Sequence, residues 1–573
     1  MSAHEEEKKS GVGAAFMLPT VLPTVVAASP RAEKCIRGYP LVWLLYLCVF
    51  ELGYLLLFVL SAFPGLHLYA TPIAVAWSWT LLPSRVLLPL FGSLVSTSPS
   101  REWFSPLLLS ITLLMLIGTY VCALVSALRL KDDDGSELKQ SRHRYLALFL
   151  GGAFLFSLTL LLQPKLFSDD IFTSIFSGRI LTVYHVDPLN TAPMQFPSDP
   201  YLGWVIAGRN TPNIFGPLWL CLSSVLVGLG GGPVETVLLF KGVAILSHLL
   251  SCVVVWSILG KLAPSRRVLG TLLYAWNPLA VIELASSGHG EGVLMLLLLC
   301  ATWLSLREAR WSQVGTLIVL GLAISTNLIT LLIVPLYIWF GVRTVRSLSR
   351  AFWMCSWRML LVLIPALLIW LPFWRGATTF FAVTSAIDME HFVHSPVGTL
   401  AGPIRVLFQF VANSLHLPSF LHPIPSADIT LRASAAFIFA LIYIDLFGQV
   451  RRAPRTMGGM RYRAGADVQM TIPGFDVLLR SWGMALFWYL VLVSGWFWPW
   501  YMLWMLWAVI LRRFDAFTSA VLLLSATALF LYPLLGWPRI PSYQSALIFG
   551  IPLVYLFLVR RREKQLERIV PTL

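Results

Sequence analysis

Charged residues are scarce in this sequence. Asp, Glu, Lys and Arg make up 12% of its 573 residues, whereas hydrophobic residues make up 57% and the mean hydropathy is +0.77. Soluble domains carry about 25% charged residues. This scarcity excludes a water-soluble protein of this size and indicates a membrane protein with many spans.

Two further absences narrow the possible functions. None of the seven cysteines forms a Cys-x-x-Cys pair, so neither a disulfide framework nor a zinc site is indicated. The net charge is +15. The basic residues do not form a continuous basic face, because they fall in short clusters between apolar runs. This is the positive-inside pattern of membrane proteins. We therefore expect membrane lipids, and no nucleic acid, as partners.

Long apolar segments recur from Tyr39 onward. They are roughly 17–25 residues long, which is enough to cross about 30 Å of hydrocarbon, and they lack the period-two alternation of barrel strands. We predict an all-α polytopic transmembrane helical bundle of about 13–15 membrane helices, with re-entrant or interfacial helices in its outer loops. The segment Thr71–Ser96 contains three prolines and is not expected to cross as one helix.

The basic clusters predict the sidedness of the chain. Those expected in the cytoplasm lie at residues 31–37, 129–144, 343–358, 451–463, 512–513 and 560–562. The run Tyr145–Gln163 then leads outward, and the loop Pro164–Asn213 is exoplasmic. The functional face of this cell-membrane protein is therefore expected outside.

Two topologies are possible between residues 213 and 343. Five plain crossings would place the basic residues at 266–267 and 307–310 outside, against the positive-inside rule. If Phe215–Gly230 is instead re-entrant or interfacial, the rule is obeyed, and a later apolar run becomes two short helices broken near Asn327. We favour the second topology.

The sequence Ser168-Asp169-Asp170 forms a polar island at the mouth of an apolar run. Desolvating an ionised carboxylate costs several kcal/mol, so acids at a membrane boundary are candidates for function. The apolar spacing over residues 171–176 predicts a short interfacial helix with both acids at its N-terminus. Asp170, with Asp169 beside it, would suit a general base for a hydroxyl nucleophile. The alternative is that the two acids simply cap the helix.

Other candidates carry charged, amide or aromatic groups: Arg179, Lys241, His289, Glu291, Asn327, Trp500, Tyr501 and Arg539. The two basic residues at 179 and 241 would bind a phosphate, or else snorkel to an interface. Gly288-His289-Gly290-Glu291 is either a ligand-binding turn or a plain helix–helix turn. The aromatic pair at 500–501 either stacks on a sugar or anchors a helix.

The order of these motifs resembles that of a known family, the bacterial GT-C glycosyltransferases. Most similar are the polyprenyl-phosphate-mannose-dependent α-mannosyltransferases of cell-envelope glycolipids. The resemblance runs from about Phe154 to Phe557 and implies a many-helix fold with a catalytic acid at Asp170. It rests on Asp-Asp-Ile-Phe at 169–172, Phe215-Gly216-Pro217-Leu218-Trp219, Asn277-Pro278-Leu279, Gly288-His289 and Pro499-Trp500-Tyr501.

The sequence departs from the family pattern at four places. Ser177 stands where an acid often precedes Gly-Arg, and Asp187-Pro188-Leu189 replaces Asn-Pro-Tyr. Gly290-Glu291 replaces Asn-Asp, and Asn327 stands where a lysine is frequent. The resemblance therefore leaves the sugar, the acceptor and the phosphate contacts open.

The resemblance also suggests a division of the chain. Residues 1–38 are expected to be a disordered cytoplasmic N-terminus without a cleavable-signal pattern, and residues 39–144 to be extra membrane helices. Residues 145–560 would form the GT-C-like catalytic region, and residues 561–573 a cytoplasmic tail.

The resulting hypothesis is an inverting glycosyltransferase. A sugar, mannose first of all, would pass from a polyprenyl-phosphate donor to a glycan or lipid-linked acceptor on the exoplasmic side, with Asp170 as base. Cationic side chains would stabilise the leaving phosphate, so no metal cofactor is expected. One alternative is a transporter or flippase of lipid-linked sugars, although the paired halves of transporters are not evident. The other is a non-catalytic membrane scaffold.

Overall fold

The structure is a computed structural model that describes residues 40–91, 103–129, 137–212, 215–307, 309–379, 392–416, 423–454, 474–535 and 543–569. Within these ranges the chain is almost entirely helical. Two short strands, β1 (Tyr69–Ala70) and β2 (Lys165–Leu166), pair antiparallel. The prediction of an all-α fold is confirmed.

The helices fall into long and short groups. The long ones are α2 (Pro40–Leu60), α5 (Phe104–Leu128), α6 (Glu137–Leu161), α9 (Pro233–Leu262), α13 (Arg310–Thr326), α15 (Leu348–Trp370), α17 (Pro396–Ser414), α18 (Pro423–Arg452) and α23 (Gln544–Ile569). The shorter ones are α3 (Pro72–Ala76), α4 (Leu82–Leu87), α7 (Asp170–Thr182), α8 (Pro217–Leu229), α10 (Arg267–Ala275), α11 (Pro278–Val281), α12 (Glu291–Ser305), α14 (Val334–Val342), α19 (Phe475–Trp488), α20 (Leu503–Ile510), α21 (Ala516–Ala528) and α22 (Leu531–Leu535).

Many of these helices suit a bilayer. Among the described residues, seven are long and apolar enough to cross, and a pair bent by 46°, Pro264–Ala275 and Pro278–Ser286, gives up to eight. Several further apolar helices have 10–17 residues, and a 15-residue helix measures only about 22 Å. The polytopic membrane bundle is thus confirmed, and the total of 13–15 crossings stays a prediction about these shorter helices.

Two predicted helix breaks are present. The proline-rich segment after Thr71 forms only the short helices α3 and α4 and two 3-10 turns, Ser78–Leu81 and Leu88–Phe91. In the later apolar run, the first helix, α13, ends at Thr326. The side chain of Asn327 then caps a new turn by accepting from the Ile329 N–H at 3.0 Å. An amide side chain that satisfies a free backbone donor is a common way to restart a helix.

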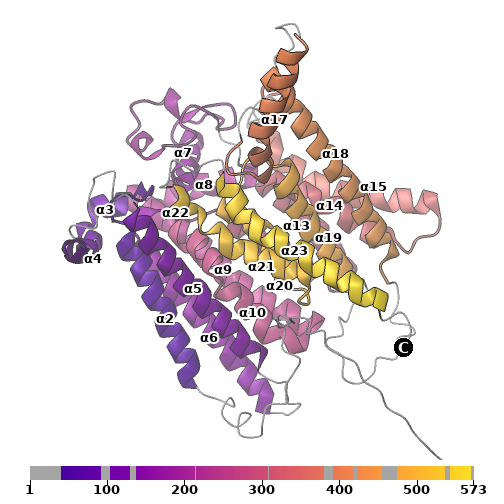
Figure 1. The fold of residues 1–573 in the computed structure, drawn as a ribbon, viewed down its shortest axis with the longest axis horizontal. Coiled ribbons are helices and arrows are strands. Elements are labelled where there is room, and N and C mark those ends of the chain that lie inside the picture. Colours follow the sequence, from indigo (N-terminus) through magenta and orange to yellow (C-terminus); the bar gives the residue numbers. More distant parts are fainter. Residues whose placement is uncertain are drawn as a thin grey trace, which may run out of the picture.

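Figure 1 shows how the helices are grouped. The indigo and purple helices α2, α5 and α6 lie side by side and share one large apolar core with α9 and α10 (Figure 1). The orange helices α17 and α18 pack together on another flank, and α7 lies toward the top of the view while α10 lies toward the bottom (Figure 1).

Trp276 occupies the bend between α10 and α11. It is fully buried, and its indole N–H donates to the Phe149 carbonyl at 3.1 Å. The rings of Trp43, Phe50, Phe149 and Phe156 surround it at centroid distances of 5.5–6.1 Å. A buried indole with its N–H satisfied adds both apolar area and a fixed orientation. This aromatic cluster therefore holds the bent pair of helices against α2 and α6.

The next residues make the bend itself. Asn277 accepts from the N–H groups of Leu279 and Ala280 at 3.0 and 3.3 Å, and Pro278 follows as the first residue of α11. Proline is favoured there because that N–H has no helical partner. The Asn-Pro-Leu motif thus has a structural use in directing the chain toward Gly288-His289.

Helix α9 separates two polar faces of the molecule. Its 30 residues span about 45 Å, and Lys241 near one end packs close to Gly288. The other end leads within four residues to Arg266. The distance along α9 from Lys241 to Leu262 is about 32 Å, close to the hydrocarbon thickness of a bilayer. The acid pair and the basic pair of the 266–267 turn therefore lie at opposite ends of the bundle.

Some predictions concern residues outside the described part. The predicted disordered N-terminus, Arg539 and most of the inner loop that follows Arg452 belong to this group. The proposed division into regions at residues 38, 144 and 560 likewise stays a prediction.

Candidate active site

The acid pair begins helix α7 (Asp170–Thr182), as predicted. Asp169 is its N-cap residue and Asp170 its first residue. The apolar residues predicted to lie along one face, from Ile171 to Phe176, are buried in a second core with Trp219 of α8. The Trp219 indole N–H donates to Ser174 at 3.0 Å. The helix is thus packed into the protein, which fixes the position of both acids.

The two acids have different surroundings. Oδ2 of Asp169 accepts from the backbone N–H groups of Ile206 and Ala207 at 3.2 and 2.6 Å, and the residue is 4% exposed. Asp170 keeps 31% of its side chain exposed, and its carboxylate lies 3.9 Å from Nδ1 of His289. Asp169 therefore ties the outer loop to α7, whereas the carboxylate of Asp170 remains accessible.

The Gly-His-Gly turn brings His289 to Asp170. Gly288 has φ of +69°, and a Cβ there would lie 2.8 Å from Ile171 and 3.1 Å from Lys241. A Cβ on Gly290 would lie 2.7 Å from the Trp219 ring. Glycine permits both the left-handed backbone and the close approach. The two glycines thus allow the turn to pack directly against α7, α8 and α9.

His289 is surrounded by carboxylates. Its Nε2 lies 3.3 Å from Glu283, and its Nδ1 lies 3.7 Å from Glu291 and 3.9 Å from Asp170. One ring face stacks on Trp500 at 4.2 Å, and Trp498 stacks on Trp500 in turn at 5.2 Å. The side chain of His289 is 2% exposed. The structure therefore brings together three of the predicted positions, 170, 289 and 291, with Trp500.

Glu283 and Tyr532 extend this cluster and were missed in the sequence. Glu283 lies in the π-helical turn η6 (Ile282–Ser286), is fully buried, and accepts from the Tyr532 hydroxyl at 2.6 Å. Widened π turns are frequent at functional sites. Glu283 could have been recognised as a candidate, because a carboxylate inside an apolar run indicates a functional site. No local pattern marks Tyr532, because its partner is 249 residues away.

The cluster shifts the acidity of its members. The carboxylate of Asp170 is only partly exposed, and the resulting loss of hydration raises its pKa to about 7; His289 opposes this rise, and the charges of Asp169, Glu291 and Glu283 add to it. Burial alone would lower the pKa of His289, but Glu283, Glu291 and Asp170 outweigh it, so that this pKa lies above its usual value. Asp170 can thus exchange a proton near neutral pH.

Tyr69 lies close enough to the acid pair to feel its charge. Burial and the charges of Asp169 and Asp170 raise the pKa of its phenol to about 12. The strand β1 that carries Tyr69 pairs with β2, which directly precedes the acids. A neutral phenol held beside the carboxylates is a hydrogen-bond donor for a polar ligand.

The two predicted phosphate-binding cations already have partners. Arg179 forms a two-pronged ion pair with Asp199, with distances of 2.8–3.1 Å, and its guanidinium lies 4.0 Å from the Tyr201 ring. Lys241 is fully buried and donates to the carbonyls of Leu160 and Leu161 at 3.0 and 2.6 Å. Both contacts stabilise the fold, so binding of a phosphate by either residue stays a prediction.

The remaining candidates take different positions. Asn327 uses its side chain to cap the broken helix, as described above. Tyr501 stacks on Trp504 at 4.1 Å and contacts Trp500 edge-on. Arg539 lies outside the described residues.

Comparison with known proteins gives a family match for part of the chain. Residues 67–343 match the family model described as alpha-(1->6)-mannopyranosyltransferase, N-terminal domain, of the MptA/B family. This range contains the acid pair, Glu283 and the Gly-His-Gly turn. No curated protein and no solved structure matches the chain. Because the matched family consists of transferases, the match favours the enzyme hypothesis over the transporter and scaffold hypotheses. We conclude that this chain is a multi-pass membrane glycosyltransferase of the GT-C type, and that its residues 67–343 are similar to the N-terminal domain of the MptA/B family of α-(1→6)-mannopyranosyltransferases.

Proposed function

We propose that the enzyme transfers mannose from a polyprenyl-phosphate donor to a hydroxyl of a glycan or lipid-linked acceptor on the exoplasmic side. Asp170 acts as the general base. The observation that carries this assignment is the contrast between the two acids: Asp169 is bound to backbone N–H groups, whereas Asp170 is accessible and has a pKa of about 7. A base with a pKa near the working pH is the most effective.

The proposed step is a single displacement. Asp170 accepts the proton of the acceptor hydroxyl while the oxygen forms a bond to the anomeric carbon. The bond from that carbon to the phosphate oxygen breaks, and the polyprenyl phosphate leaves with the electron pair. One displacement inverts the anomeric carbon, so an α product requires a β-linked donor. The step needs no metal to generate the nucleophile, because Asp170 takes the proton directly.

The surrounding acids support the transition state of this step. Glycosyl transfer builds positive charge at the ring oxygen and the anomeric carbon. Fixed carboxylates at 283 and 291 stabilise such charge in a site that does not have to reorganise. His289 keeps part of the negative charge balanced in the resting enzyme, since its Nδ1 faces both Asp170 and Glu291.

A groove on α9 supports a donor that carries a lipid. It has a volume of about 510 Å³ and is lined by Leu238, Leu239, Gly242, Val243 and Leu246 along one face of the helix, with Glu235 at its end. These residues repeat every three to four positions and are mostly apolar, which suits an isoprenoid chain. The groove adjoins the outer half of α9, the half that carries Lys241.

The first prediction concerns the two acids. We expect the Asp170→Asn variant to lose about 10²- to 10⁴-fold in transfer rate with little change in melting temperature. The Asp169→Asn variant should keep most activity, because its amide oxygen can still accept from Ile206 and Ala207. Transfer of labelled mannose by purified protein measures both. Full activity of Asp170→Asn, or loss of activity only in Asp169→Asn, contradicts the assignment of the base.

The pH dependence follows from the pKa of Asp170. A base works only when it is deprotonated, so the rate should fall about tenfold per pH unit below pH 7 and level off above it. Removing a neighbouring negative charge with Glu291→Gln lowers the pKa of Asp170 and should move the midpoint to lower pH. A profile that is flat between pH 5 and 8, or a midpoint that moves upward in Glu291→Gln, would show that another group titrates.

The groove yields a steric test. A Cβ on Gly242 meets no atom within 4 Å, so Gly242→Leu fills the groove without a clash in the fold. We expect a raised KM for the polyprenyl donor and an unchanged melting temperature. Gly118→Leu on α5 is the matched control, because its Cβ also meets no atom within 4 Å. An equal KM in the two variants rules out the groove as the donor site.

The sidedness is tested by cysteine labelling. Ser198 and Ser265 are both exposed and lie on the loop beside α7 and on the turn after α9, respectively. In a background without other cysteines, an impermeant maleimide should label Ser198→Cys in intact cells, and Ser265→Cys only after permeabilisation. The reverse pattern would place Asp170 in the cytoplasm and remove the proposed exoplasmic reaction.

A further inference from the structure

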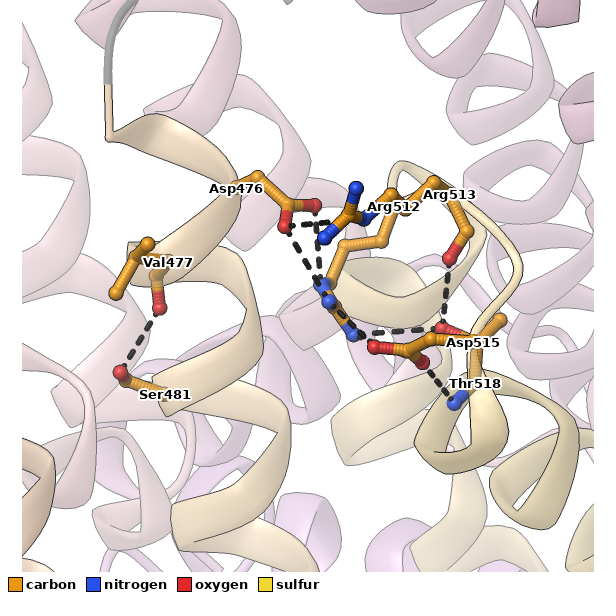
Figure 2. Close-up of polar contacts among 7 residues, drawn as sticks. All are labelled: Asp476, Val477, Ser481, Arg512, Arg513, Asp515 and Thr518. Atoms are coloured by element: carbon orange, nitrogen blue, oxygen red, sulfur yellow. Dashed lines mark hydrogen bonds and ion pairs between the residues drawn. The ribbon is translucent and has the colours of Figure 1, made fainter. Parts of the chain in front are cut away.

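A second polar cluster lies at the end of the bundle opposite Asp170. It is formed by the end of α18, the start of α19 and the turn from α20 to α21. Figure 2 shows its centre: the guanidinium of Arg512 lies between Asp476 and Asp515. Arg512 is 1% exposed and contacts Asp476 at 3.3 Å and Asp515 at 2.9 Å. Asp515 in turn caps α21 by accepting from the Thr518 N–H at 2.7 Å (Figure 2).

Both carboxylates of the cluster are thus used by one arginine. Arg513, which is 75% exposed, reaches Asp476 only at 4.0 Å. Arg480 contributes no ion pair, and its buried Nε has no hydrogen-bond partner among the described residues. Arg452 contacts Asp445 at 3.5 Å, and that pair is largely exposed. Four arginines thus face three aspartates, Asp445, Asp476 and Asp515, which leaves a small excess of positive charge.

Arg266 increases this excess. It is 8% exposed, its guanidinium lies 5.4 Å from the ring of Phe514, and both of its terminal nitrogens are buried without a hydrogen-bond partner in the described part of the chain. Phe514 stands between the cluster residues Arg513 and Asp515. A buried guanidinium whose donors have no partner lowers the stability of the fold, unless an anion accepts hydrogen bonds from them.

The cluster surrounds a cavity of about 310 Å³. Its polar lining consists of four arginines, of the two carboxylates that bind Arg512 and of one amide: Arg452, Arg480, Arg512, Arg513, Asp476, Asp515 and Gln449. Its apolar lining includes Pro454 and Val477. The elements that bound it are the ends of apolar helices, which places it at the level where lipid headgroups meet a bilayer. The size, the charge and the position fit a phosphate group.

We propose that this arginine cavity binds a phosphate-bearing anion, independently of the transfer reaction at Asp170. Arg480 and Arg513 are the direct ligands, because Arg512 is held by its two acids. Arg266 does not line the cavity but adds positive charge beside Phe514. Arginine matches phosphate geometry through its planar fork of donors. The phosphate comes from an anionic phospholipid headgroup or from a soluble phosphate, and the test separates these two sources.

The test uses the purified full-length protein in detergent. Its melting temperature is followed during titration with a short-chain phosphatidylglycerol, with the corresponding phosphatidylcholine, and with inorganic phosphate. Arg480→Gln removes one proposed ligand, and Arg480→Lys keeps its charge. The matched control is Arg346→Gln, which removes an exposed charge from the turn between α14 and α15, outside the cavity.

We expect an anion to raise the melting temperature of the wild type, with an apparent Kd about tenfold weaker in Arg480→Gln. Arg346→Gln should bind as the wild type does, and Arg480→Lys should bind more tightly than Arg480→Gln. A rise with phosphatidylglycerol alone identifies a lipid headgroup, and a rise with inorganic phosphate identifies a soluble ligand. No rise with either, or equal rises in Arg480→Gln and Arg346→Gln, overturns the proposal.

Discussion

The placement of His289 among three carboxylates is the interaction on which the site depends. Buried acids repel one another and are costly without compensation, and His289 is the group that faces all three. Its own position depends on two glycines that let the turn approach α7, α8 and α9. The charge balance of the cluster therefore depends on the backbone conformation of this turn. Trp500 closes it by stacking on the imidazole ring.

The bilayer explains why polar groups gather at two ends of the bundle. Helix α9 is longer than the hydrocarbon core is thick, so its ends reach both surfaces. Acids collect around Asp170 at one end, and arginines collect around Arg512 at the other. In between, polar side chains such as His248 and Trp276 bond to backbone carbonyls. Most charge is thus concentrated near the two ends of α9, although Glu51 lies in the middle of α2 and accepts from the Thr159 hydroxyl.

Local patterns in the sequence predicted much of the fold. Prolines, capping residues and apolar spacing explain three of its features. These are the helix break at Asn327, the lack of a single continuous helix after Thr71 and the helix that begins at Asp170. The gathering of Asp170, His289 and Trp500 also agrees with the order of the motifs. These features are readable because each depends on a few neighbouring residues.

What the sequence did not show depends on contacts between distant residues. The bond from Tyr532 to Glu283 joins positions 249 residues apart, and the carbonyl partners of Lys241 lie about 80 residues earlier. Arg179 was expected to face a ligand, and its partner Asp199 follows 20 residues later on an irregular loop. Only the packed structure shows which cations are already neutralised.

The hydrogen bonds from Ile206 and Ala207 to Asp169 have a consequence for how such enzymes diverge. They anchor the far part of a long surface segment within one residue of Asp170. The intervening stretch can therefore change in length or composition while the position of the acid pair is preserved. If Asp170 is the base, as proposed, the surroundings of the acceptor can change without displacing it.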